Sequence, residues 1–219
     1  MKDCLIIFAK EPKAGKVKTR LQGYLSQEMC VKLYKAFLKD TVEIARRVNC
    51  KYKIIAYESN GNAPNYLKTI AAPFQFYEQK GENLGRRMYN AFKFALRKGS
   101  QRTVIIGSDS PTMPVAYIKD AFDWLKTADI VLGPSLDGGY YLIGLRKPRL
   151  SLFKNIRWSS KTALADTLKN VQRFKKAVSL LPYWYDVDEP SALAILKRDL
   201  KKKENSCVAK RTKRFFQVL

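Results

Sequence analysis

Hydrophobic positions alternate along most of the chain between short apolar runs and longer amphipathic stretches. Short apolar runs typical of β-strands lie at residues 4–9, 52–57, 74–77, 103–107, 129–132, 140–145 and 177–181. Helical periodicity marks many of the intervening segments, notably residues 26–48, 83–97, 114–126 and 159–170. This alternation predicts an α/β fold with a mostly parallel sheet.

Several residues predict where the helices begin and end. Ser26 is a suitable N-cap for the first long helix, and Ser159 is expected to cap the helix that ends near residue 170. Gly99 is expected to end the helix over 83–97. Glu189 and Pro190 begin a terminal helix, because proline is tolerated in the first turn.

The C-terminal end of the chain is strongly basic. Nine Lys and Arg residues lie between positions 197 and 214, against only Asp199 and Glu204. A run of like charges is typical of a solvated, partly disordered extension, although contact with nucleic acid or anionic lipid is an alternative. We therefore predict one domain over residues 1–200 and a basic tail over residues 201–219.

Composition limits the chemistry that an active site can use. The 219 residues include no histidine, which excludes Ser-His-Asp and Cys-His hydrolases and His-ligated zinc. The four cysteines form no CxxC pair. No apolar run reaches the roughly 18 residues of a membrane span, and the N-terminal run is too short for a signal peptide. We expect a cytoplasmic protein with no membrane span.

Loops that follow strands carry the charged residues of most interest, since ligands of open α/β sheets bind outside the carboxyl ends of the strands. The loop after the first strand holds four lysines, Gly15 and Arg20, but neither a Walker A nor a GxGxxG motif. Such a loop can hold polyphosphate, and a basic surface loop is the alternative. Arg87 could add phosphate contacts from a helix start.

Acidic residues mark three other loops. Asp109 follows a strand within Gly-Ser-Asp-Ser-Pro and either binds a hard cation such as Mg²⁺ or Mn²⁺ or caps a turn. Asp137 precedes two glycines, which suits either close approach of a substrate or a hairpin turn. Asp186 and Asp188 lie two residues apart, so that in extended backbone both point to one side; capping of the following helix is the alternative.

Six segments, in this order and at about this spacing, resemble the radical-SAM/selenodomain-associated transferase family, whose members are often described as glycosyltransferases. The resemblance covers about residues 3–200, and the segments are FAKEPKAGKVKTRL at 8–21, ENLGRRM at 82–88, GSDSP at 107–111, LGPSLDGGYYLIGL at 132–145, RWSSKT at 157–162 and DVDEPSAL at 186–193. The sequence departs from the family pattern at Ala14, Asn83, Glu189 and Ala192.

The resemblance implies a Rossmann-like, three-layer α/β/α fold of the nucleotide-diphospho-sugar transferase (GT-A) type and assigns roles to particular residues. The residues expected to bind phosphates of the substrate are Lys10, Lys13, Gly15, Lys18, Arg20 and Arg87. Those expected on the sugar or acceptor side are Asp137, Gly138, Gly139, Tyr140 and Trp158. Asp109 and Asp188 are the expected ligands of Mg²⁺ or Mn²⁺, and Asp137 and Asp188 the candidate catalytic carboxylates.

Three functions are compatible with this pattern, and the sequence favours the first. A glycosyltransferase would move a sugar from a nucleotide diphosphate sugar to a small acceptor with the help of a divalent metal. A nucleotidyltransferase would join a nucleoside triphosphate to a phosphorylated acceptor and release pyrophosphate. The net charge of +23 makes nucleic-acid binding a distant third hypothesis.

Overall fold

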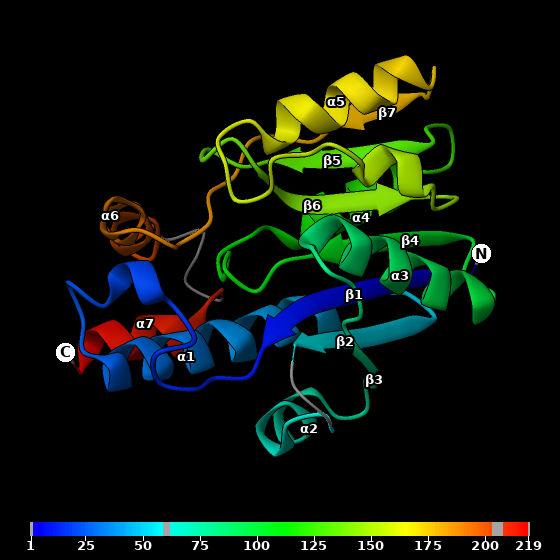
Figure 1. Ribbon diagram of the computed structural model, residues 1–219. Helices are drawn as coiled ribbons and strands as arrows, with labels where there is room; N and C mark the ends of the chain where they lie inside the picture. The colour runs from blue at the N-terminus through cyan, green and yellow to red at the C-terminus, as the bar shows by residue number, and fades with distance from the viewer. Residues whose placement is uncertain (1, 59–61, 203–207, 219) are drawn as a thin grey trace.

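A seven-stranded sheet forms the centre of the protein (Figure 1), whose computed structural model describes residues 2–58, 62–202 and 208–218. In spatial order the strands are β3 (Gln75–Glu78), β2 (Tyr52–Glu58), β1 (Asp3–Lys10), β4 (Arg102–Ile106), β6 (Tyr140–Leu145), β5 (Ile130–Pro134) and β7 (Val178–Leu180). Every strand pair is parallel except those that involve β6. The predicted α/β fold with a mostly parallel sheet is therefore confirmed.

β6 is antiparallel because it follows β5 through a tight hairpin. Gly138 adopts a φ of +87° in this loop, and the Gly139 N–H donates to Asp137 Oδ1 at 2.9 Å. Glycine reaches such a φ without the steric cost that a side chain would add. The hairpin interpretation of Asp137 thus describes the backbone, and the loop still opens onto the site described below.

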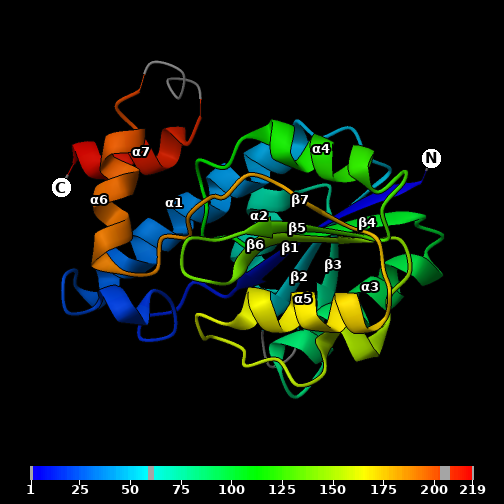
Figure 2. The same ribbon diagram turned by 90° about the horizontal axis from the view of Figure 1, so that it is seen from above.

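Helices cover both faces of the sheet (Figure 2). α1 (Gln27–Arg46), α2 (Asn65–Ala71) and α4 (Val115–Trp124) pack on one face, and α3 (Leu84–Arg97) and α5 (Ala163–Arg173) on the other. Ser26 accepts a hydrogen bond from Met29 N and caps α1 as expected. Ser159 does not cap α5, because the helix begins four residues later and Ser159 itself has a φ of +61°. Two short 3-10 helices, η1 (Thr19–Leu21) and η2 (Leu150–Phe153), lie in the connections.

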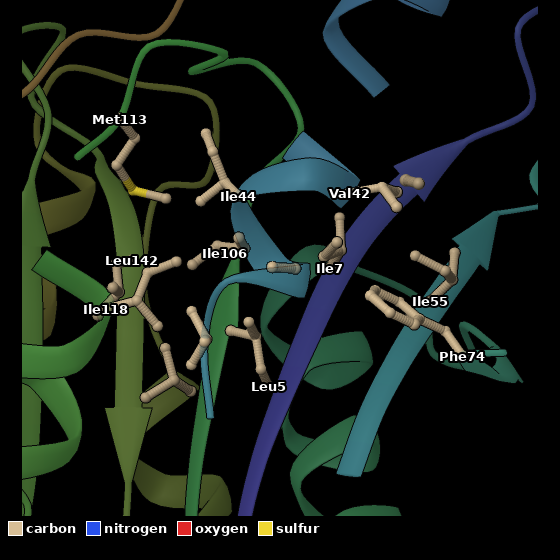
Figure 3. Packing of buried hydrophobic residues seen from close by; sticks show 14 of the residues in the cluster. Leu5, Ile7, Val42, Ile44, Ile55, Phe74, Ile106, Met113, Ile118 and Leu142 are labelled. Atoms are coloured by element: carbon tan, nitrogen blue, oxygen red, sulfur yellow. The ribbon is translucent and has the colours of Figure 1, made fainter. Parts of the chain in front are cut away.

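The larger part of the core lies between the sheet and the α1, α2 and α4 layer (Figure 3). Leu5 and Ile7 of β1 point into this layer, where they meet Val42 of α1 and Ile118 of α4. Cys4, Ile6 and Phe8 of β1 face the α3 and α5 layer. β1 is therefore buried on both faces, which explains its nearly continuous apolar sequence.

The C-terminal part of the chain forms a third apolar cluster against α1. α6 (Pro190–Asp199) and α7 (Lys210–Gln217) pack beside this helix, and α1 and α7 lie side by side (Figure 1). Phe215 of α7 is buried, and Asp40 of α1 accepts hydrogen bonds from Arg211 N, Thr212 N and the Thr212 hydroxyl. Residues 210–217 thus differ from the expected solvated extension, because Phe215 and Thr212 give the basic segment a face that can be buried. Residues 203–207 and 219 of the predicted tail lie outside the described residues.

The parallel strands bring the predicted functional loops to one edge of the sheet. β1 and β4 are neighbours, so the loops that follow Lys10 and Ile106 leave the sheet side by side. The segment after β7 returns to the same edge, where Val187 N donates to Asp109 O at 2.9 Å. No helix among the described residues is long and apolar enough to cross a membrane.

Candidate active site

Lys18 is buried at the carboxyl edge of the sheet, where its ammonium group joins two acidic loops. Lys18 Nζ donates to Asp109 Oδ1, to Asp188 Oδ1 at 2.9 Å and to Val187 O at 2.8 Å. The Lys18 side chain is 2% exposed, whereas those of Asp109 and Asp188 are 34% and 45% exposed. The two carboxylates therefore meet at a buried cation and remain open to a ligand.

The backbone and two aromatic rings hold Lys18 in this position. Lys18 has a φ of +51°, which turns the chain into η1. Its ammonium group lies 5.0 Å from the ring centre of Phe37 and 5.9 Å from that of Tyr34, both on α1. A cation near aromatic faces is attracted by the ring quadrupole. The three hydrogen bonds then use all three protons that an ammonium group carries.

The charges of this group stabilise one another. Burial lowers the pKa of Lys18, but Asp109 and Asp188 outweigh burial and raise it above its usual value, so that the ammonium stays protonated. Burial also raises the pKa of Asp188, and here the charge and hydrogen bond of Lys18 outweigh it and lower the pKa. The site consequently holds a lysinium and an ionised Asp188 at neutral pH.

Asp186 occupies a different environment only two residues away. It accepts a hydrogen bond from the Ser110 hydroxyl. Burial raises the pKa of Asp186 to about 7, and the nearby carboxylates of Asp109, Asp137 and Asp188 add to this shift. The Asp186-Val187-Asp188 segment thus places one ionised and one partly protonated carboxyl at the same edge.

Tyr34 and Ser108 complete the support of the site and were not recognised from the sequence. The Tyr34 hydroxyl accepts from Lys10 N at 2.9 Å and lies 2.9 Å from Ser108 Oγ. It therefore ties the end of β1 to the loop after β4. Tyr34 lies on the buried face of α1, where its position is that of any core aromatic residue, so the pattern held no signal for this role.

A pocket of about 620 Å³ opens beside the carboxyl groups of Asp186 and Asp188. Four acidic residues and two basic ones line it, together with Tyr140, Trp158 and Tyr185; the charged residues are Arg20, Asp137, Lys161, Asp186, Asp188 and Glu189. The volume lies in the range of small-molecule sites, which are roughly 300–1,000 Å³. The structure thus brings Asp137, Gly139, Tyr140 and Trp158 together with Arg20 and Asp188 around one pocket.

Close packing fixes the wall of this pocket. A Cβ on Gly138 would lie 2.1 Å from Lys161 O, and Gly138 O accepts from Leu164 N at 3.0 Å. Trp158 packs directly over Gly85 of α3, since a Cβ there would lie 2.5 Å from the indole ring, and its ring meets that of Tyr140 edge-on. Only glycine thus fits at position 138, where the β5–β6 hairpin touches the loop that precedes α5.

The predicted phosphate-binding residues fall into two groups. Lys10 and Arg87 both approach Glu58, at 4.0 and 3.1 Å, on the β2 side of the first loop. Arg20 approaches Glu189 at 3.5 Å and reaches the pocket. Lys13 is exposed and pairs with Glu11, and Gly15 adopts a φ of +72° at the turn of the same loop. Lys18 differs from the other predicted phosphate-binding residues, since its ammonium group is buried against the carboxylates of Asp109 and Asp188.

Asp109 and Asp188 offer oxygen ligands suited to a hard cation. Among the described residues no three acidic or cysteine side chains converge to hold a metal ion by themselves. Mg²⁺ is commonly bound by one or two carboxylates, water and substrate phosphates, so a converging pair of partly exposed aspartates fits this cation.

Two similar proteins have names that describe transferases acting on nucleotides or nucleotide sugars. A crystal structure of a protein from Desulfovibrio desulfuricans G20, provisionally named a nucleotide-diphospho-sugar transferase, is 32% identical and matches 100% of this chain and 95% of its own with a TM-score of 0.91. A 2-phospho-L-lactate guanylyltransferase from Methanobrevibacter smithii is 30% identical over 56% of this chain and 53% of its own length. The chain thus matches about half the length of that relative.

A more distant structure shows the fold together with a metal. The manganese complex of Rv0371c from Mycobacterium tuberculosis H37Rv is 14% identical and matches 90% of this chain and 98% of its own, with a TM-score of 0.55. At this identity the likeness shows the fold alone. Together with the Desulfovibrio structure, this likeness agrees with the predicted fold of the nucleotide-diphospho-sugar transferase type.

A family model also matches residues 41–160, just over half of the chain. The matched segment contains β2 to β6 and therefore both Asp109 and the Asp137 hairpin. The comparisons add no radical-SAM association, so that part of the resemblance is not supported. The chain belongs to the family described as uncharacterized proteins conserved in bacteria, DUF2064.

Proposed function

We propose that the protein is a nucleotidyltransferase, which transfers a nucleoside monophosphate from a nucleoside triphosphate to a phosphorylated small molecule and releases pyrophosphate. The observation that carries the proposal is the pair formed by Asp109 and Asp188 around Lys18, beside a basic loop and an open pocket. The guanylyltransferase relative supports this reaction type, since its name describes nucleotidyl transfer.

This proposal reverses the order that the sequence favoured. The sequence placed glycosyl transfer first, because its segments, including the Asp109 and Asp137 loops, resemble a family whose members are often described as glycosyltransferases. The guanylyltransferase relative favours the nucleotidyl alternative, while the provisional name of the Desulfovibrio protein keeps nucleotide sugars as the competing donor. Both donors carry a diphosphate group, so the same basic loop would serve either of them.

In the proposed reaction, the basic loop binds the triphosphate and the pocket receives the acceptor. Lys10 lies near Glu58 and Arg20 near Glu189, so in the proposed complex these two cations contact different phosphate groups. Asp137 and Tyr140 line the acceptor pocket. An oxygen of the acceptor phosphate attacks the α-phosphorus, the bond from this phosphorus to the bridging oxygen breaks, and pyrophosphate leaves with the bonding electrons.

Lys18 prepares the carboxylates for this step. It holds Asp109 and Asp188 at one place and keeps Asp188 ionised. These two residues would hold Mg²⁺ or Mn²⁺, which when bound neutralises charge on the phosphates of the leaving group. Proposed catalytic roles follow for Asp188, through its charge, and for Asp137, through contact with the acceptor.

Pyrophosphate release tests the proposal directly. The purified protein is incubated with GTP, CTP, ATP or UTP and Mg²⁺, with a panel of phosphorylated hydroxy acids and sugar phosphates, and pyrophosphate is measured. We expect release that depends on both a triphosphate and an acceptor. Release of a nucleoside diphosphate from UDP- or GDP-sugars, with no pyrophosphate from any triphosphate, would instead establish glycosyl transfer.

Asp109→Asn tests the role of the site in the same assay. Loss of one charged oxygen ligand should lower turnover by about 100-fold or more, because several kcal/mol of charge stabilisation depend on the cation. Asp120→Asn, on the exposed side of α4, is the matched control and should retain activity. Equal activity of the two variants would remove Asp109 from the mechanism.

A further inference from the structure

A second pocket, of about 470 Å³, lies where α7 packs on α1. We call it the α1–α7 pocket. Its charged lining residues are Lys39, Asp40, Glu43, Arg46, Arg47, Lys210 and Arg211. None of these residues belongs to the candidate active site, and the pocket is built from α1, α2, α7 and the start of α4.

Five of the lining residues are basic and only two are acidic. Both acids are already engaged. Asp40 uses its two oxygens to bind the start of α7, through Arg211 N at 3.1 Å and Thr212 N at 2.8 Å. Glu43 lies 3.7 Å from both Arg46 and Arg47. The pocket therefore has an excess of positive charge that its own acids do not neutralise.

Lys39 of α1 and Lys210 of α7 are exposed and form no ion pair with any residue that the structure describes. They come from two different helices that line the same pocket. Like charges brought to one place repel each other, so the packing of α7 on α1 creates a position at which an anion is favoured.

Part of the pocket wall is apolar. Ile70, Val115 and Val208 are partly buried, whereas Ile44 and Met113 are almost completely buried and offer little surface to a ligand. An inorganic phosphate would fill only a small part of about 470 Å³ and would leave the three partly buried side chains in contact with water. A ligand with an apolar or aromatic body and an anionic group matches both parts, because apolar contact and charge pairing then act on the same molecule.

We propose that the α1–α7 pocket is a binding site for a small organic anion, a phosphate, sulfonate or carboxylate attached to an apolar or aromatic body. The anionic group pairs with Lys39 and Lys210, and the body contacts Ile70, Val115 and Val208. Such a ligand bridges α1 and α7 and stabilises the docking of α7. The site is separate from the pocket beside Lys18, because the two pockets share no lining residue.

1-Naphthyl phosphate serves as the probe, with 1-naphthol and inorganic phosphate as its two halves. Binding to the full-length protein is followed by the fluorescence of the naphthyl group and by calorimetry. Each titration is carried out first without nucleotide and then with GTP and Mg²⁺ in excess. We expect 1-naphthyl phosphate to bind at least about tenfold more tightly than either half. Loss of binding when GTP is added would place the probe in the nucleotide site and would overturn the proposal.

A double variant, Lys39→Glu with Lys210→Glu, locates the binding. The exchange at Lys210 lies in the first turn of α7, where an acidic side chain is favoured by the helix dipole, so α7 is expected to remain folded. Lys93→Glu with Lys169→Glu makes the same change of charge on α3 and α5, on the opposite face of the sheet.

The two double variants give opposite results under the proposal. We expect the pocket variant to weaken binding of 1-naphthyl phosphate by about tenfold or more, and the control variant to leave it within about twofold. Circular dichroism and thermal melting check that both variants are folded. Equal weakening in both, or no change in the pocket variant, would show that net charge or another surface binds the probe.

Discussion

At the scale of single residues, Lys18 determines the arrangement of the candidate site. Its ammonium group connects the loop after β1 to the loop after β4 and to the segment before α6, through Asp109 and Asp188. A residue in a lysine-rich loop is ordinarily solvated. Here the rings of Tyr34 and Phe37 and three oxygen acceptors replace the lost water. The position of this one side chain therefore couples three separate stretches of the sequence.

Lys18→Met should reduce both activity and stability. Removal of the cation leaves Asp109 and Asp188 facing each other, and the loss of one partner of a fully buried pair costs about 3–5 kcal/mol. Because the carboxylates are partly exposed, we expect a decrease in the free energy of unfolding of about 1–2 kcal/mol. Urea unfolding and the pyrophosphate assay measure the two effects. Lys16→Met, at an exposed position of the same loop, is the control, and an equal effect of both changes would contradict the role of Lys18.

Gly138→Ala tests the contact between the hairpin and the loop that precedes α5. The new Cβ would lie 2.1 Å from Lys161 O at a φ of +87°, so backbone strain and a collision coincide. We expect the free energy of unfolding to fall by about 2 kcal/mol and Tm to fall by about 4–8 °C. Gly23→Ala has nothing within 4 Å of its Cβ and should leave Tm nearly unchanged. Similar Tm values for the two variants would show that the hairpin can move away from Lys161.

At the scale of the elements, α7 shows how a basic segment can become part of the packed structure. Phe215 is buried in the cluster with α1 and α6, and Thr212 is 0% exposed. Asp40 satisfies two N–H groups of the first turn of α7, which have no partners within the helix. A short helix of low apolar content is thus fixed by one buried ring and one carboxylate.

Asp40→Ala should loosen α7 selectively. The Thr212 N–H and hydroxyl lose their acceptor in a buried position, which costs about 1–3 kcal/mol for an unsatisfied group. We expect faster amide exchange in residues 210–217 than in the strands, together with a lower free energy of unfolding. Asp120→Ala, at an exposed position of α4, is the matched control. Unchanged exchange in α7 would show that Phe215 alone holds the helix in place.

The elements also show which features the sequence could predict. Strands such as β1 and β4 and the cap at Ser26 follow from local patterns of apolar and polar residues, and the structure contains them. The prediction that Ser159 caps α5 was wrong, because residues 158–162 form turns and a bend before α5 begins. The burial of Lys18 depends on Asp188, which is distant in the sequence, and only the fold brings the two together. Local sequence patterns therefore indicated which loops could carry a site. The contacts between those loops, such as that of Lys18 with Asp188, are seen only in the three-dimensional structure.

At the scale of the whole molecule, charge is divided unevenly between sites. The chain carries 42 Lys and Arg residues and 19 Asp and Glu residues. Four of these acids nevertheless line the pocket beside Lys18, where only two cations join them. The α1–α7 pocket shows the opposite ratio, with five cations and two acids. The lining of the candidate pocket is therefore net acidic, as expected if it binds a metal ion, whereas the basic loop beside it and the α1–α7 pocket are net positive.

The same imbalance predicts how salt affects stability. Even if every acid formed an ion pair, more than half of the basic side chains would remain without an acidic partner, so repulsion between like charges opposes folding. Raising KCl from about 20 mM to about 300 mM shortens the Debye length from roughly 20 Å to below 10 Å and screens this repulsion. We expect Tm to rise, because the screened repulsions outnumber the weakened surface ion pairs. The Lys93→Glu and Lys169→Glu double variant lowers the net charge by four and should show a shallower rise. A fall in Tm with KCl would mean that ion pairs such as Arg102 with Asp3 contribute more than the repulsion between unpaired cations.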